Sequence, residues 1–230
     1  MNFNEECSKL GIYINKDIED KFYNYYLELV RVNENMNLTN ITELNDVYNK
    51  HFLDSLYLNK AIDKESFSLC DVGSGAGFPA IPLAITNSNS DIVIIDSLNK
   101  RINFLNNTIR LLGLDNVKAI AKRAEEAKEY FNKFDYVTAR AVAKLNILLE
   151  ICMPLVKLGG SFIAMKSINY EDELNDSKKA IDILGGKLSN IITYDLKDDA
   201  GKRSLIIINK VRETPNKYPR LFKKIKENPL

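Results

Sequence analysis

Hydrophobic and polar positions divide the chain into a helical first part and an alternating second part. Over residues 17–33, apolar side chains recur at the spacing of one helical face, and acidic residues open the segment, where they suit the positive end of a helix. Thr42 is expected to cap another helix that runs to about Ile62, and residues 4–10 form a shorter one. We therefore predict a helical cap over residues 1–65.

From residue 67 onward, short β-like runs alternate with segments of helical periodicity. We predict strands at 67–72, 91–96, 117–121, 134–139, 161–165, 188–196 and 203–211, and helices at 78–86, 99–112, 125–131, 145–155 and 170–184. This order implies a parallel sheet with helices on both faces. The last two strands must pair as a hairpin, which places an antiparallel strand at one edge.

The predicted fold class is therefore α/β, with a seven-stranded Rossmann-like sheet over residues 66–230 and an N-terminal helical extension. A parallel sheet that ends in a hairpin is the architecture of class I methyltransferases, which use S-adenosylmethionine.

Composition is that of an ordinary globular protein, with 45% hydrophobic and 27% charged residues among 230 and a net charge of +1. The charge is unevenly distributed, because residues 202–230 hold nine Lys or Arg against two Glu. Such a basic end fits an anionic partner, although a solvated tail is the alternative.

Cysteine and histidine are too few for several kinds of chemistry. Cys7, Cys70 and Cys152 are far apart in the sequence, so neither a zinc site nor a disulfide framework is indicated. His51 is the only histidine, which argues against a multi-histidine metal site and a histidine-based triad. With no signal peptide and no long apolar run, we expect a cytoplasmic protein that is not in a membrane.

A glycine-rich turn follows the first predicted strand. Gly73, Gly75 and Gly77 occur in the spacing G-x-G-x-G, which differs from the dinucleotide pattern G-x-G-x-x-G. Glycine tolerates positive φ and lets the backbone approach a ligand, so this turn is expected to bind the methionine part of a nucleotide-like ligand. The alternative is a tight strand-to-helix turn without a ligand.

Polar residues also follow the next strands, at the edge where ligands of such sheets bind. Asp96, with Ser97 beside it, can accept hydrogen bonds from a ribose diol, or it can cap the next helix. Glu125 can accept from an adenine amino group while Ala124 leaves room for the ring, or it can simply open a surface helix.

The chain resembles the RsmG (GidB) family, bacterial methyltransferases of a guanine N7 in 16S ribosomal RNA. The matching stretches run nearly from end to end: Asn37–Ile41, His51–Leu56, Asp71–Leu83, Ile95–Arg101, Arg123–Glu126, Phe134–Ala143 and Tyr218–Arg220. Two positions depart from the family pattern, since Ala80 and Ser167 stand where glycine is usual.

The resemblance implies S-adenosylmethionine as cofactor and 16S rRNA, or the small ribosomal subunit, as partner of a monomeric enzyme. The expected cofactor contacts are Gly73, Gly75, Gly77, Phe78, Asp96, Ser97, Ala124, Glu125 and Arg140. Arg140 is also expected to position the substrate, the alternative being an ion pair with a core acid. The expected RNA contacts are Lys100, Arg101, Lys166 and Arg220. His51 and Asp54 either line the rim of the site or form a structural pair.

The chemistry separates the candidate reactions. Guanine N7 carries a lone pair and needs no deprotonation, so a site without an obvious base suits it. Methylation of cytosine C5 needs a cysteine nucleophile, but Cys70 and Cys152 fall inside a predicted strand and helix. Ribose 2′-O methylation remains an alternative if Lys166 acts as a base, and so does a non-catalytic RNA-binding or ribosome-assembly factor on the same scaffold.

Overall fold

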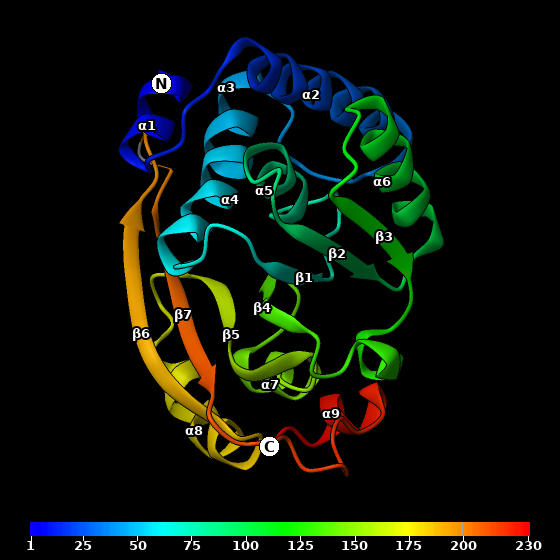
Figure 1. Cartoon of the computed structure of the whole chain (residues 1–230), viewed down its shortest axis with the longest axis vertical. Coiled ribbons are helices and arrows are strands. Elements are labelled where there is room, and N and C mark those ends of the chain that lie inside the picture. The colour runs from blue at the N-terminus through cyan, green and yellow to red at the C-terminus, as the bar shows by residue number, and fades with distance from the viewer. Residues whose placement is uncertain (199) are drawn as a thin grey trace.

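The computed structural model describes residues 1–198 and 200–230, in which seven strands form one sheet of order β3-β2-β1-β4-β5-β7-β6 (Figure 1). The strands are β1 (Ser68–Val72), β2 (Asp91–Asp96), β3 (Val117–Ala121), β4 (Phe134–Arg140), β5 (Val156–Ser167), β6 (Gly186–Asp195) and β7 (Lys202–Lys210). The pairs from β3 to β5 are parallel, whereas β7 is antiparallel to both its neighbours. The predicted fold class is thus confirmed.

The position of the antiparallel strand differs from the prediction. β7 lies between β5 and β6, so the edge strand is β6. The reason is burial: residues 204–208 of β7 are buried, whereas residues 187–190 of β6 are exposed. The antiparallel register pairs Ser167 with Arg203 and Tyr194 with Arg203, which brings the start of β7 and the end of β6 to the carboxyl edge of the parallel strands.

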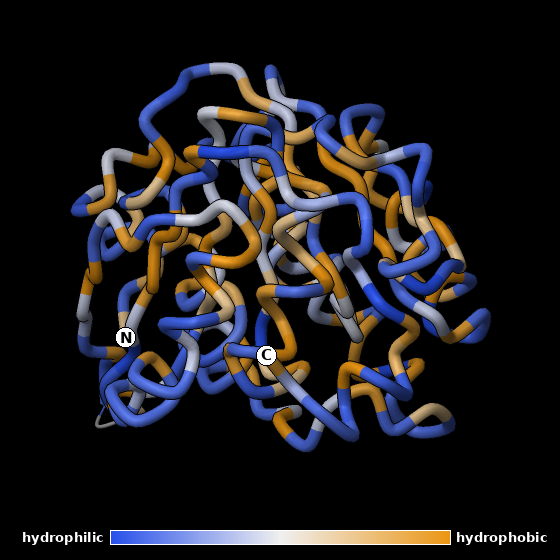
Figure 2. Tube along the Cα trace, turned by 90° about the horizontal axis from the view of Figure 1, so that it is seen from below, coloured by the Kyte–Doolittle hydropathy of each residue, from blue (hydrophilic) through white to orange (hydrophobic). Residues whose placement is uncertain are grey.

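Helices cover both faces of the sheet (Figure 1). On one face lie α5 (Ala80–Thr86), α6 (Asn99–Leu111) and the N-terminal helices; on the other lie α7 (Leu145–Cys152), α8 (Glu171–Ile183) and α9 (Phe222–Glu227). Between β3 and β4, the predicted helix is two short 3₁₀ turns, η3 (Ala124–Glu126) and η4 (Lys128–Tyr130). Each face has its own apolar cluster, and hydrophobic segments run through the interior in Figure 2.

The N-terminal residues form α1 (Phe3–Lys9), α2 (Lys16–Met36), α3 (Leu44–Val47), a π-helical turn η1 (Tyr48–Leu53), α4 (Asp54–Leu56) and a 3₁₀ turn η2 (Tyr57–Ala61). Thr42 is not the predicted cap, since α3 is preceded by Glu43 without a side-chain capping bond. The aromatic rings of Tyr25 and Phe52 lie 5.5 and 6.0 Å from that of Phe78. These helices therefore share a core with the sheet, and the division at residue 65 stays a prediction.

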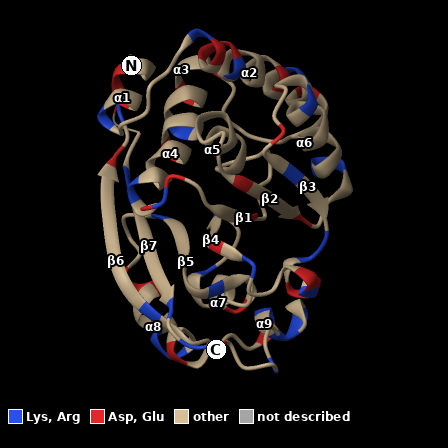
Figure 3. Cartoon of the chain, in the orientation of Figure 1, with Lys and Arg blue, Asp and Glu red and all other residues tan. Residues whose placement is uncertain are grey.

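Over residues 1–198 and 200–230, no helix is both long and apolar enough to cross a membrane. The three cysteines are buried and unpaired. Basic and acidic residues are interspersed along α2, with lysines paired to acids one turn away (Figure 3).

Candidate active site

The glycine-rich turn after β1 is fixed by hydrogen bonds on its underside, the side toward α2, and has open space on the opposite side. Gly73 and Gly75 have φ of +74° and +61°, and a Cβ placed on Gly75 would meet nothing within 4 Å. From below, the Tyr25 hydroxyl donates to the Ala76 carbonyl at 2.5 Å. Asp71 is buried beneath the turn and accepts from the Ser74 hydroxyl at 2.5 Å and from the Ala80 amide at 3.3 Å. The turn thus presents bare backbone to a ligand while its underside is fixed.

Gly77 lies on the underside of this turn, and its contact with the cofactor stays a prediction. A Cβ there would come within 2.7 Å of the Tyr25 hydroxyl and 2.9 Å of Leu105. Glycine is needed at this position because α2 approaches closely and φ is +104°. Gly77 lines neither of the two cavities described below. Ala80 is also buried behind the turn, so this departure from the family pattern does not face the ligand.

Asp71 predicts a pH dependence of stability. Burial raises its pKa to about 7, whereas an aspartate in an unfolded chain titrates near pH 3.9. Between about pH 4 and 7 the folded state therefore holds a proton that the unfolded chain releases, and the free energy of unfolding falls with rising pH by up to about 1.4 kcal/mol per unit. Asp71→Asn removes this loss, so the variant should gain stability relative to the wild type from pH 4.5 to 6.5 (~2 pH units) in urea unfolding. Parallel pH dependences would contradict the assignment.

A cavity of about 360 Å³ lies where β2 and β3 end. Asp96 lines it and stabilises the turn, accepting from the Leu98 amide at 3.0 Å and the Gly75 amide at 3.3 Å. Ser97, Ala124 and Glu125 also line this cavity. Glu125 is buried, and within the described residues its Oε1 has no hydrogen-bond partner but lies 3.8 Å from the Arg123 guanidinium; burial raises its pKa.

The donor and acceptor pattern of this cavity fits the adenosine half of S-adenosylmethionine. Asp96 is an acceptor suited to a ribose diol, and Glu125 Oε1, which accepts no hydrogen bond from the described residues, is an acceptor suited to an exocyclic amine. A buried carboxylate oxygen without a partner is costly, so a ligand that donates to it gains affinity. The four predicted contacts Asp96, Ser97, Ala124 and Glu125 are therefore brought together as expected.

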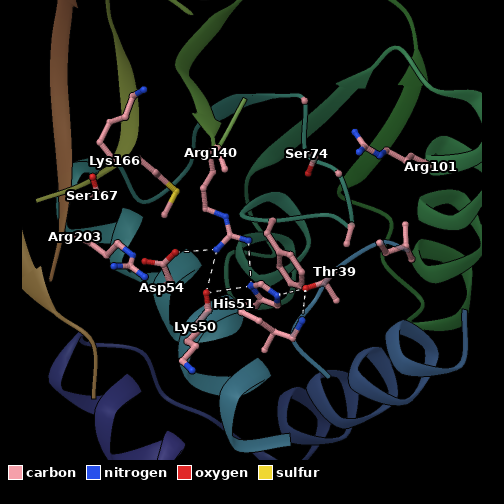
Figure 4. A pocket seen from close by; sticks show the side chains of 18 of the residues that line it. Thr39, Lys50, His51, Asp54, Ser74, Arg101, Arg140, Lys166, Ser167 and Arg203 are labelled. Atoms are coloured by element: carbon pink, nitrogen blue, oxygen red, sulfur yellow. Dashed lines mark hydrogen bonds and ion pairs between the residues drawn. The ribbon is translucent and has the colours of Figure 1, made fainter. Parts of the chain in front are cut away.

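A second cavity, of about 520 Å³, lies beside the first, and Gly73, Arg101 and Ala141 line both. Its floor is an ion-pair network around Arg140, at the end of β4 (Figure 4). The Arg140 guanidinium donates to the Asp54 carboxylate at 2.8 Å and to the Lys50 carbonyl at 3.2 Å. Its Cζ also lies 5.1 Å from the centroid of the Phe78 ring. Arg140 thus forms the ion pair with a buried acid that was the alternative, and it also lines the cavity, while its role in positioning the substrate stays a prediction.

His51 and Asp54 come from the N-terminal helices and form the rest of this floor. The Tyr194 hydroxyl donates to the second Asp54 oxygen at 2.8 Å. The His51 ring stacks on Phe78 with centroids 4.5 Å apart, and its Nε2 lies 2.8 Å from the Thr39 hydroxyl. His51 Nδ1 lies 3.1 Å from the Lys50 carbonyl and 3.4 Å from the Arg140 guanidinium. A proton on Nδ1 donates to Lys50 while Nε2 accepts from Thr39, whereas a proton on Nε2 donates to Thr39 while Nδ1 accepts from Arg140.

His51 is expected to stay neutral through physiological pH. Burial, and then the charge of Arg140, lower its pKa to about 3. Because the unfolded chain binds this proton near pH 6.5, the contribution of His51 to stability is present above that pH and is lost as pH falls toward 3. The chain has one histidine, so its imidazole NMR signals are unambiguous, and they should not shift between about pH 5 and 8. A midpoint near 6.5 would contradict the burial of this ring.

The predicted RNA contacts differ in their surroundings. The Lys166 ammonium donates to the Ala143 carbonyl at 2.8 Å and to Glu173 at 2.6 Å, and it points away from Arg140 (Figure 4). Arg220 is held by the buried Glu150 through two guanidinium bonds of 2.8 and 2.6 Å. Both cations hold protein groups rather than offering free charge. Arg101 lines both cavities and lies 3.3 Å from Asp96, while Lys100 is exposed.

Several cavity residues escaped the sequence analysis. Thr39 and Lys50 reach the cavity from the N-terminal part, and Tyr194 and Arg203 reach it from β6 and β7. Ser167, the second departure from the family pattern, also lines this cavity, and its carbonyl accepts from Ser204. The sequence carries a signal for Arg203 in principle, because a strand inserted antiparallel beside β5 starts at the edge where the parallel strands end. Tyr194 pairs with Arg203 and therefore lies at the same edge.

A family model described as rRNA small subunit methyltransferase G matches residues 18–205. The chain belongs to this family, GidB. Among curated GidB relatives, the ribosomal RNA small subunit methyltransferase G of Staphylococcus saprophyticus is 49% identical over 94% of this chain and 92% of that protein. That of Lactobacillus acidophilus is 48% identical over the same shares. The predicted resemblance is confirmed, and with it the class of S-adenosylmethionine-dependent rRNA methyltransferase.

Solved structures agree with the GidB assignment at the level of the fold. A Thermotoga maritima structure titled a SAM-dependent O-methyltransferase aligns with a TM-score of 0.57 at 17% identity, covering 82% of this chain and 73% of that one. A crystal structure of M. jannaschii TYW2 in complex with AdoMet aligns with a TM-score of 0.54 at 21% identity, covering 67% of this chain and 74% of that one.

Proposed function

We propose that this GidB protein transfers a methyl group from S-adenosylmethionine to N7 of a guanine in 16S rRNA. The observation that carries the proposal is the pair of adjoining cavities, which share Gly73 and Ala141. The cavity with Asp96 and Glu125 suits the adenosine half of the cofactor. The cavity floored by Arg140 then receives the methionine half beside Gly75 and the target base.

The polar groups around Arg140 are suited to holding a base rather than to removing a proton. Asp54 is engaged by Arg140 and Tyr194, and His51 by Thr39 and the Lys50 carbonyl. S-adenosylmethionine supplies an electrophilic methyl group when bound. Guanine N7 presents a lone pair without prior deprotonation, so what this cavity has to provide is alignment and exclusion of water, which can contribute about 7–11 kcal/mol.

The ribose 2′-O alternative is less well supported. It requires a base near the hydroxyl, and Lys166 was the candidate. The ammonium of Lys166 donates to Glu173 and to the Ala143 carbonyl and points away from Arg140, so it is not directed at a hydroxyl bound above Arg140 (Figure 4).

RNA is proposed to approach over the rim of the larger cavity. Lys50, Arg101 and Arg203 line the cavity, and Lys100 is exposed next to Arg101. Cations in such positions attract phosphates and make binding dependent on salt. We further propose that one chain suffices, because it contributes all these residues itself, and that it meets its substrate in the cytoplasm.

The decisive experiment uses small ribosomal subunits that lack the modification, with methyl-labelled S-adenosylmethionine. Labelled 7-methylguanosine after digestion to nucleosides is the expected result. Label on a ribose would favour the 2′-O alternative. Binding of subunits without any transfer, together with failure to bind S-adenosylmethionine, would favour a non-catalytic assembly factor.

A further inference from the structure

The C-terminal helix α9 forms one side of the cavity that suits adenosine. Phe222, its first residue, lines this cavity together with Ala124, Glu125 and Ile151. The Cζ atom of Arg123 lies 5.7 Å from the centroid of the Phe222 ring. In Figure 1, α9 lies against the segment that follows β3. The ring is only partly buried by protein, so one part of it remains available to a ligand.

Two anchors fix Phe222 at this place. Arg220, two residues earlier, binds Glu150 of α7 through its backbone amide at 2.9 Å and through both sides of its guanidinium. The same guanidinium donates to the Asn228 carbonyl at 3.1 Å, beyond the end of α9. Ile225 of the helix is fully buried in the apolar cluster on this face of the sheet. The hydrogen bonds of Arg220 therefore fix both ends of α9, and the burial of Ile225 fixes its middle.

We propose that Phe222 is a cofactor-binding residue, whose ring forms the outer apolar wall of the adenine subsite. This inference rests on the proposed placement of S-adenosylmethionine. An aromatic wall contacts the purine and keeps water away from Glu125 Oε1, which has an ion pair with Arg123 at 3.8 Å but no hydrogen bond among the described residues, and this strengthens a hydrogen bond from the adenine amine. Arg220 acts through Phe222 as a positioning residue, which accounts for a buried ion pair in a region far from the Arg140 network.

A single fluorophore tests the position of the ring. The chain has no tryptophan, so Phe222→Trp introduces one reporter at this wall. S-adenosylhomocysteine and 5′-methylthioadenosine, which both carry adenine, should change its emission, whereas methionine should not. The matched control is Leu221→Trp, at the neighbouring position that is 65% exposed, and its emission should not respond. An unchanged Phe222→Trp emission, with binding verified by calorimetry, would overturn the proposal.

Affinity provides a second measurement. Phe222→Ala should raise the Kd of S-adenosylhomocysteine and of 5′-methylthioadenosine by the same factor, about tenfold, because both lose one stacking partner. Phe222→Tyr should restore affinity, and Leu221→Ala should not change it. Thermal unfolding without ligand checks that each variant is folded, and Phe222→Leu replaces Phe222→Ala if the latter is not.

The two proposals fail in different ways. If the wild type does not bind S-adenosylhomocysteine, the proposed function fails. If the wild type binds it and folded Phe222→Ala binds it equally well, the role of Phe222 alone is refuted.

Discussion

Gly75→Asp is expected to abolish binding of S-adenosylmethionine, with a rise in Kd of at least about 100-fold, or about 2.7 kcal/mol. Gly75 has space for a side chain, since its Cβ would meet nothing within 4 Å, but this space belongs to the larger cavity. The new carboxylate would stand in the space of the ligand and close to Asp96, whose oxygen lies 3.3 Å from the Gly75 amide. Isothermal titration calorimetry with S-adenosylhomocysteine measures the loss.

Gly113→Asp is the matched control for this change. Gly113 ends the turn after α6 with φ of +60°, and its Cβ would also meet nothing within 4 Å. It therefore imposes the same backbone strain without entering either cavity, and its affinity for the ligand should equal that of the wild type. Wild-type affinity in folded Gly75→Asp would refute the placement of the cofactor over this turn.

Arg140→Ala is expected to lower the rate of methyl transfer at saturating S-adenosylmethionine by at least about 10²-fold, because the floor that aligns the target base is lost. The change also leaves Asp54, whose side chain is 5% exposed, with Tyr194 as its remaining side-chain partner. Removing one member of such a buried pair costs about 3–5 kcal/mol of stability. Single-turnover transfer and thermal unfolding must therefore be measured on the same preparation.

Arg140→Lys and Lys210→Ala separate the two effects. Arg140→Lys keeps a charge for Asp54 but loses the planar group above Phe78, so it should remain folded and still transfer slowly. Lys210 is buried, donates to the carbonyls of Met153 and Val156, and lines neither cavity. Its alanine variant should lose stability while keeping its transfer rate when folded. Wild-type transfer by Arg140→Lys would assign Arg140 a purely structural role.

The alternation of strands and helices could be predicted because it depends on local signals, whereas the insertion of β7 between β5 and β6 could not. Asp96 ends β2 and Glu125 follows β3, so their positions in the sequence place both at one edge of the sheet, where they line one cavity. The packing of Gly77 against Tyr25 could not be predicted, because a glycine pattern shows where the backbone is unusual but not which side of it faces a ligand. The side of the turn that faces the protein is set by Tyr25 of α2, which is 51 residues from its hydrogen-bond partner Ala76.

The partners of charged groups could not be predicted, because they come from remote parts of the chain. Arg140 and Asp54 are 86 residues apart, and Tyr194 and Asp54 are 140 apart. Whether Lys166 and Arg220 meet RNA or a carboxylate depends on α8 and α7 packing beside them. Residue type and spacing do not carry that information, since an exposed and a paired lysine look the same in sequence.

The insertion of β7 between β5 and β6 also sets the order in which the protein becomes competent during synthesis. Strands β1 to β5 pair with one another and all precede β6 and β7 in the chain, so their partners leave the ribosome before the hairpin does. Arg203 and Tyr194 join the larger cavity only when the hairpin pairs with β5. A chain that ends before β6 therefore has five strands of the sheet but lacks Tyr194 and Arg203 from the wall of the larger cavity.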